Sequence, residues 1–211
     1  MKTILCFGDS NTNGSNPDGI PARHPYDVRW PGRLQKMLGE DYYVIEEGMG
    51  GRTTIWDDPL EPLRCGLQFL PVALQSHKPI DLVILSLGTN DCKNIFGASA
   101  RVIGQGMNRL VETVKKFDYG QGVPVPKILV ISPIHMGEHI AESVFASFDE
   151  ESGRKVKMIA PFYEQVAVKN GCAFLDAALV AGPGADQLHM DGESHRKLAE
   201  AVGKMVKEIL G

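Results

Sequence analysis

Short apolar runs rich in valine, isoleucine and leucine recur along the chain, separated by longer mixed segments. At least three of these runs are nearly continuous rather than alternating with polar residues. Continuous runs are typical of strands that are covered on both faces, as in a parallel sheet. The pattern therefore predicts about five buried parallel strands, at Thr3–Phe7, Tyr43–Glu46, Asp81–Leu87, Lys127–Ser132 and Ala173–Asp176.

The segments between these runs carry the helical period instead. Ser99 can cap a helix whose apolar residues recur every three or four positions, and the stretch Leu198–Ile209 repeats that spacing. A third segment, Val156–Asn170, ends at Asn170-Gly171 as helices often do, while Pro161 predicts a late start or a kink. Gaps of roughly 35 to 45 residues between the strands leave room for right-handed helical crossovers.

This succession of elements predicts one domain over residues 1–211, a doubly wound, three-layer α/β fold of about five parallel strands. In such sheets ligands bind beyond the carboxyl ends of the strands, so the loops that follow the strands are the place to look for chemistry.

Composition narrows the function classes. A formal net charge of −4 argues against nucleic acid or an anionic membrane as the main partner. The four cysteines show no paired spacing, which indicates reduced thiols in a cytoplasmic protein rather than disulfides or a zinc site. We expect neither a metal nor a cofactor, and no signal peptide or membrane span.

A small polar block follows four of the predicted strands. The blocks are Gly8-Asp9-Ser10-Asn11, the glycine-rich Gly48–Thr53, Gly88–Asp91 and, beyond the last strand, Asp186–His189. Carboxyl ends of parallel strands share one edge of the sheet, so these residues are expected to converge. A serine becomes a nucleophile when an imidazole takes its proton and a carboxylate orients that imidazole. Amide donors, here expected from Ser10, Gly51 and Asn90, stabilise the oxyanion that forms.

The blocks GDSN, GGRT, GTND and DxxH, in this order, resemble the SGNH-hydrolase superfamily, also called the GDSL-type lipase/esterase family. The stretches VIEEGMGGRTT, DDP and DLVILSLGTND are similar to small bacterial aryl esterases that also act as acyltransferases and perhydrolases. The resemblance implies an SGNH-type fold with Ser10 as nucleophile, His189 as general base, Asp186 as orienting carboxylate, and an oxyanion hole that includes Gly51 and Asn90. The first block departs from the family in reading GDSN rather than GDSL, and Glu46-Glu47-Gly48 stands where many members have an asparagine.

Further residues are candidates for substrate contact. Two of them, the tryptophans, lie on proline-stiffened loops that can wall a pocket, although a small core beneath the loops would explain them equally well. His24 and His77 are expected to be solvated, and His195 to lie on the surface of the last helix. The candidates are Asp9, Asn11, Trp30, Trp56 and His135.

The leading hypothesis is a serine esterase acting on small acyl esters, acetyl to butyryl, with acyl transfer to alcohols or peroxide as an added activity. One alternative is a flavodoxin-like module whose loop from Ser10 to Gly14 wraps a flavin phosphate. Another is a lysophospholipase-type esterase. We also expect a homo-oligomer, from a dimer up to an octamer, because the segments Asn13–Pro31 and Pro133–Glu151 would expose apolar residues in a monomer.

Overall fold

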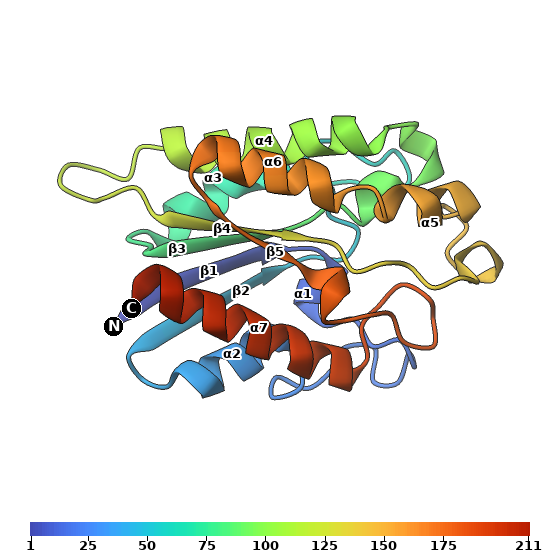
Figure 1. The fold of residues 1–211 in the computed structure, drawn as a ribbon, viewed down its shortest axis with the longest axis horizontal. Coiled ribbons are helices and arrows are strands. Elements are labelled where there is room, and N and C mark those ends of the chain that lie inside the picture. Colours follow the sequence, from blue (N-terminus) through green and yellow to red (C-terminus); the bar gives the residue numbers. More distant parts are fainter.

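The computed structural model describes residues 1–211 and contains one sheet of five parallel strands in the order β2-β1-β3-β4-β5. Figure 1 shows the sheet between two layers of helices, which confirms the predicted three-layer α/β fold. The strands are β1 (Lys2–Gly8), β2 (Tyr42–Gly48), β3 (Leu82–Ser86), β4 (Lys127–Ser132) and β5 (Ala173–Asp176), close to the predicted runs.

Helices cover both faces of the sheet. Below it in Figure 1 lie α2 (Trp30–Leu38) and α7 (Gly192–Leu210), which pack against each other. Above it lie α3 (Gly66–His77), α4 (Ala100–Lys116) and α6 (Ala160–Asn170). The remaining elements are short: α1 (Ser10–Asn13), α5 (Glu150–Val156) and four single 3-10 turns, η1 (Asn90–Cys92), η2 (Asn94–Phe96), η3 (Ile140–Glu142) and η4 (Ala177–Leu179).

The central strand β1 explains why the apolar runs are continuous. Ile4 and Cys6 belong to the core cluster on the α7 side, whereas Leu5 and Phe7 belong to the cluster on the α4 side. All four side chains are fully buried. Full burial of a large aliphatic or aromatic side chain contributes about 1.5–3 kcal/mol, so both faces of this strand stabilise the fold.

The helix boundaries follow the predicted signals. The Ser99 hydroxyl accepts a hydrogen bond from the Val102 N–H at 3.4 Å and caps α4. Pro161 lies in the first turn of α6, where its missing N–H costs nothing, so the predicted late start is confirmed and α5 is a separate helix. Gly171 ends α6 in the left-handed conformation. None of the helices combines the length and the apolar character that crossing a bilayer requires.

The segment after β4 corrects one expectation. Ile140 and Phe148 were expected to add to an exposed apolar patch, but both are buried against the core above the sheet. Phe145 is half-buried against the same core, and only Val144 is largely exposed. The prediction of a sizeable apolar patch on this segment is therefore wrong, because most of its apolar side chains complete the core of the same chain.

Candidate active site

Ser10 opens the single helical turn α1, directly beyond the carboxyl end of β1. The Asp9 carboxylate caps this turn by accepting the Asn11 backbone N–H at 3.0 Å. A side chain in place of Gly8 would collide with Thr12, because α1 folds back closely over the strand. In Figure 1, α1 lies at the end of the sheet opposite the two chain termini. The small residues of the first polar block thus hold Ser10 at the carboxyl edge.

The loop after β2 brings Gly51 to the same edge. Gly51 has a φ of +76°, a region that residues with a Cβ rarely adopt. A Cβ at this position would also lie 2.6 Å from Glu61 Oε2 and 2.7 Å from Arg64 Nε. The backbone conformation therefore favours glycine here, while the flexible Glu61 and Arg64 side chains would only have to shift to admit a Cβ.

Arg52 ties this loop to the strand edge and to Asn90. Its guanidinium donates to the carbonyls of Gly8, at 3.0 Å, and Glu47, and it stacks 4.2 Å from the centre of the Phe7 ring. Burial lowers the pKa of Arg52 to about 10. The Asn90 side-chain amide donates to the Arg52 carbonyl at 3.1 Å, which fixes the orientation of that amide. The first three polar blocks are thus joined by a few buried hydrogen bonds.

Two buried carboxyl groups lie next to the predicted site residues. Burial raises the pKa of Asp9 to about 6 and that of Asp91 to about 7. The Asp91 carboxyl accepts the Thr54 backbone N–H at 3.0 Å and the Thr54 hydroxyl. Burial disfavours the ionised form of these groups. Less negative charge then faces a site where an oxyanion would form.

Asp186 and His189 form a close pair beyond β5. Asp186 Oδ2 lies 2.6 Å from His189 Nδ1, while Asp186 Oδ1 accepts the backbone N–H groups of Leu188 and His189 at 2.9 and 2.8 Å. Burial by itself raises the pKa of the Asp186 carboxyl, but the His189 ring and these N–H groups lower it further than burial raises it. Gln187 between them has a φ of 69°, and this left-handed residue turns the chain back so that the pair can meet.

A cavity of about 330 Å³ joins these pieces. Ser10, Gly51, Asn90 and His189 all line it, and Asp186 is connected to it through His189. Four residues separated by most of the chain therefore meet at one depression, with a serine, an imidazole and amide groups at its surface. This set can carry out nucleophilic attack on an ester carbonyl.

A profile of the GDSL-like lipase/acylhydrolase family matches residues 6–197 of the chain. The match includes the serine block, both amide-bearing blocks and the Asp-x-x-His pair. The chain belongs to this family.

Two solved structures and one further protein are similar to this GDSL-family chain. The M. smegmatis aryl esterase is 40% identical with a TM-score of 0.92, and each chain is covered in full. A carbohydrate acetylesterase family member from Sinorhizobium meliloti is 39% identical with a TM-score of 0.94, again with full coverage of both. An acetylxylan esterase from Xylanibacter ruminicola is 26% identical over 236 residues, which cover 97% of this chain and 43% of that protein. The chain thus spans less than half the length of this curated relative.

The structure places the five further candidates away from the cavity surface. Trp30 is fully buried in the core below the sheet, so its predicted place at the pocket is wrong. Trp56 packs against the upper core with its ring 6.0 Å from that of Phe96, and neither it nor His135 lines the cavity. Asp9 and Asn11 are buried and do not line it either. Both tryptophans therefore agree with the alternative interpretation, in which they pack into a core instead of forming a pocket wall.

Several cavity residues were not predicted. Lys93, with only 7% of its side chain exposed, forms ion pairs with Asp58 at 2.7 Å and Glu61 at 2.9 Å. Arg64 completes this charged wall. Lys93 lies three positions after Asn90, a spacing within one helical turn that could have signalled it. The apolar lining comes from Met49, Phe145, Phe148 and Leu188, which the sequence pattern did not distinguish from core residues.

The other histidines correct the expected surface positions. His195 is fully buried, and burial, together with His24, lowers its pKa to about 3. Its Nδ1 accepts the Trp30 backbone N–H at 3.2 Å. His24 is buried as well and packs edge-on against His195 at 5.2 Å. His77 is half-buried, 2.9 Å from a Glu47 carboxylate oxygen. The predictions that His24 is solvated and that His195 is a surface residue are therefore wrong, whereas His77 keeps contact with solvent.

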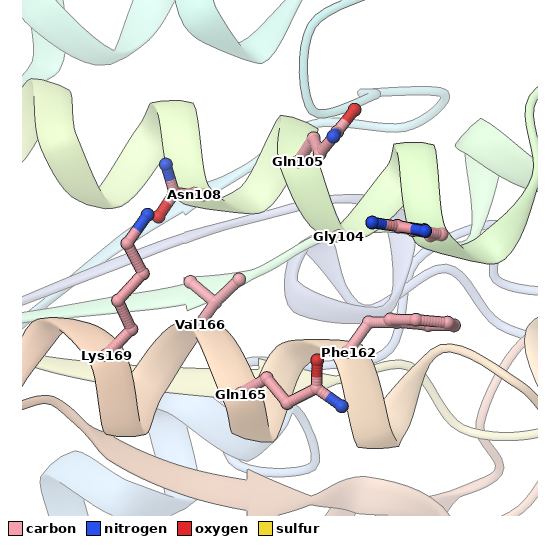
Figure 2. A pocket seen from close by; sticks show the side chains of 8 residues that line it. Gly104, Gln105, Asn108, Phe162, Gln165, Val166 and Lys169 are labelled. Carbon is pink, nitrogen blue, oxygen red and sulfur yellow. The ribbon is translucent and has the colours of Figure 1, made fainter.

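A second, larger depression of about 410 Å³ lies between α4 and α6 (Figure 2). Figure 2 shows Lys169 beside Asn108 at one end of this depression and Phe162 at the other, with Gln105 and Gln165 on its two sides. Its polar lining is mostly exposed and includes none of the residues of the four polar blocks. The candidate site residues of this GDSL-family chain line the smaller cavity beside Ser10 instead.

Proposed function

We propose that the protein is a serine esterase that hydrolyses small carboxylic esters, from acetyl to butyryl, through an acyl-enzyme on Ser10. The observation that carries this proposal is the single cavity lined by Ser10, Gly51, Asn90 and His189, with Asp186 hydrogen-bonded to the imidazole. Membership in a family of lipases and acylhydrolases supports the same reaction class.

The proposed mechanism gives every residue of the site a role. The His189 Nε2 takes the proton of Ser10, whose oxygen attacks the ester carbonyl carbon. The backbone N–H groups of Ser10 and Gly51 and the side-chain amide of Asn90 stabilise the oxyanion. Collapse of the tetrahedral intermediate breaks the ester C–O bond, and His189 returns the proton to the leaving alcohol. Water then attacks the acyl carbon of the acyl-enzyme while His189 takes its proton. Collapse of this second intermediate breaks the bond to the Ser10 oxygen, which regains a proton from His189, and releases the acid.

Asp186 keeps the imidazole in the form that this cycle needs. Its Oδ2 accepts the Nδ1–H of His189, so Nε2 carries the free lone pair that faces the reaction. The carboxylate also stabilises the imidazolium that exists while the proton is on His189. The lowered pKa of Asp186 keeps this carboxyl ionised at neutral pH.

The two walls of the cavity differ in character, which supports binding of the acyl chain at one wall and of the alcohol at the other. Phe145 packs edge-on against His189 with ring centroids 5.4 Å apart, and together with Phe148 it forms an apolar wall that suits a short acyl chain. Glu61, Arg64 and Lys93 form a charged wall that suits a polar alcohol. The relatives named aryl esterase, carbohydrate acetylesterase and acetylxylan esterase agree with short acyl groups and with varied alcohols. These observations do not favour the flavin-binding alternative.

We further propose acyl transfer to alcohols or peroxide and assembly into a homo-oligomer. Four exposed apolar side chains lie within two sequence positions of cavity residues, and they would mark a contact between subunits if they form one contiguous patch. Their contact with a second subunit would narrow the entrance and limit water, which favours other acyl acceptors. Light scattering that gives the 23.0 kDa monomer mass at full activity would contradict the assembly. The four are Leu60, Leu63, Ile95 and Val144.

A panel of p-nitrophenyl esters of rising acyl length, combined with phosphonate labelling, tests the main proposal. We expect the fastest turnover for acetyl to butyryl esters and one phosphonate adduct in intact-mass spectra. Ser10→Ala should lose the adduct and several orders of magnitude in rate. Ser15→Ala removes another serine hydroxyl at the cavity and should still form the adduct. Equal rates on octanoyl esters would instead favour the lysophospholipase alternative.

A further inference from the structure

The side chain of Asn11 bridges the backbone on both sides of His189. Its Oδ1 accepts the Met190 N–H at 2.9 Å, and its Nδ2 donates to the Leu188 carbonyl at 3.4 Å. Asn11 is buried and follows Ser10 directly on α1. One side chain therefore connects the helical turn of the serine to the segment that carries the imidazole.

The backbone around His189 depends on partners from elsewhere in the chain. The His189 carbonyl accepts the Gly184 N–H at 2.7 Å, and the Met190 carbonyl lies 3.1 Å from His24 Nε2. The only hydrogen-bond partner of the Leu188 carbonyl and of the Met190 N–H is the Asn11 side chain. A buried backbone group left without a partner costs about 1–3 kcal/mol, so this segment would move if Asn11 were lost.

Asn11 is itself held rigidly. Its backbone N–H is fixed by the Asp9 carboxylate, and α1 spans a single turn beyond β1. The side-chain amide offers one acceptor and one donor in a plane, as a peptide group of a neighbouring strand would. The leucine of the GDSL motif has neither group. A chain that reads GDSL therefore cannot form this contact.

We propose that Asn11 is a positioning residue that sets the placement of His189 relative to Ser10. The inference rests on the proposed function of these two residues. Asn11 has no role in the chemistry itself: it fixes the backbone from which the imidazole projects. A misplacement of about 1 Å in a reacting group can cost on the order of 100-fold in rate.

The test compares Asn11→Ala and Asn11→Asp with the unmodified protein on p-nitrophenyl acetate. The burst of p-nitrophenol counts functional active sites, so kcat is expressed per titrated site and unfolded protein does not contribute. Asn11→Ala should lower this kcat by about 10- to 100-fold with KM within about threefold. Asn11→Asp keeps the acceptor for the Met190 N–H and should recover part of the loss.

Asn13→Ala is the matched control. Asn13 lies on the same turn and its Nδ2 donates to the Gly48 carbonyl at 3.2 Å, away from His189. It should keep the kcat of the unmodified protein per titrated site. A normal kcat per site in Asn11→Ala, or an equal loss in Asn13→Ala, would overturn the positioning role. Full activity in His189→Ala would instead overturn the proposed function, so the two failures are distinguishable.

Discussion

Asp186→Asn is expected to remove catalysis while leaving the fold in place. Asp186 Oδ1 accepts two backbone N–H groups, at 2.8 and 2.9 Å, and Oδ2 meets His189 Nδ1 at 2.6 Å. In the variant, the amide oxygen keeps the position with two donors, so the NH2 group faces Nδ1. Two donors cannot bond to each other, and the imidazole moves its proton to Nε2. That nitrogen can then no longer accept the serine proton.

The magnitude follows from what this change removes. A hydrogen bond to a charged group contributes about 1.5–3 kcal/mol, and the imidazole must in addition return to its productive tautomer. The wrong tautomer in a serine–histidine–aspartate site costs on the order of 10,000-fold in kcat, which corresponds to about 5.4 kcal/mol. Because the two backbone bonds of Asp186 persist, the free energy of unfolding should change by only about 1 kcal/mol.

The assay is kcat on p-nitrophenyl acetate per mole of folded protein, with thermal melting measured on the same samples. Asp176→Asn is the control, because Asp176 caps η4 through the Ala178 N–H at 3.1 Å and accepts the Ser132 hydroxyl at 2.8 Å, outside the cavity. It should lose some stability and keep its kcat. A kcat within tenfold of the unmodified protein in Asp186→Asn, or an equal loss in both variants, would refute the reasoning.

Three further predictions use other residues. The pKa of Asp91 is about 7 in the folded protein against 3.8 for a free side chain, so the folded state holds this proton more tightly. The free energy of unfolding should therefore fall by on the order of 4 kcal/mol as pH rises between these two values. Urea unfolding at pH 5 and pH 8 should show a smaller fall in Asp91→Asn than in the unmodified protein, and an identical fall would contradict the prediction. Gly51→Ala should lower kcat on the order of 100-fold, because a residue with a Cβ is strained at a φ of +76° and relief of this strain displaces a proposed oxyanion donor. Gly50→Ala, where a Cβ meets nothing within 4 Å, should not, and equal rates in the two would count against the donor role. His195→Ala should cost about 2 kcal/mol of unfolding free energy, since it empties a buried site, yet keep kcat per titrated site within tenfold; an inactive but fully stable variant would be the opposite result.

The sheet was predictable because strands covered on both faces leave a simple signature. Each residue of Ile4–Phe7 must be apolar whichever face it occupies, so the run shows without an alignment. Helix ends were predictable where a chemical cap marks them, as at Ser99 and Gly171. The separation of α5 from α6 was only partly visible, because Pro161 is compatible with a kink as well as with a new helix.

The site was predictable in its residue types but not in its surroundings. Polar blocks after parallel strands indicate which residues converge, since the topology alone brings them to one edge. Whether an aromatic or a histidine lines a pocket or fills a core depends on packing between distant segments. Trp30 opens α2 and His195 lies in α7, and both are buried where these two helices meet. No local sequence pattern predicts that contact. The same holds for the bridge from Asn11 to the segment around His189.

The order of the site residues along the chain has a consequence for how the protein matures. Asn11 and Met190 bond across 179 positions, and Ser10 is synthesised long before His189. Contacts of such separation close large loops and are costly in entropy until the intervening chain has folded. The proposed nucleophile is therefore expected to stay unreactive in a nascent or partly refolded chain, even where β1 and its neighbours have already paired. The rate of phosphonate labelling of Ser10, followed during refolding, would thus report when the last strand and its loop join the sheet. A measurement of total helix and strand content does not distinguish this event from earlier ones.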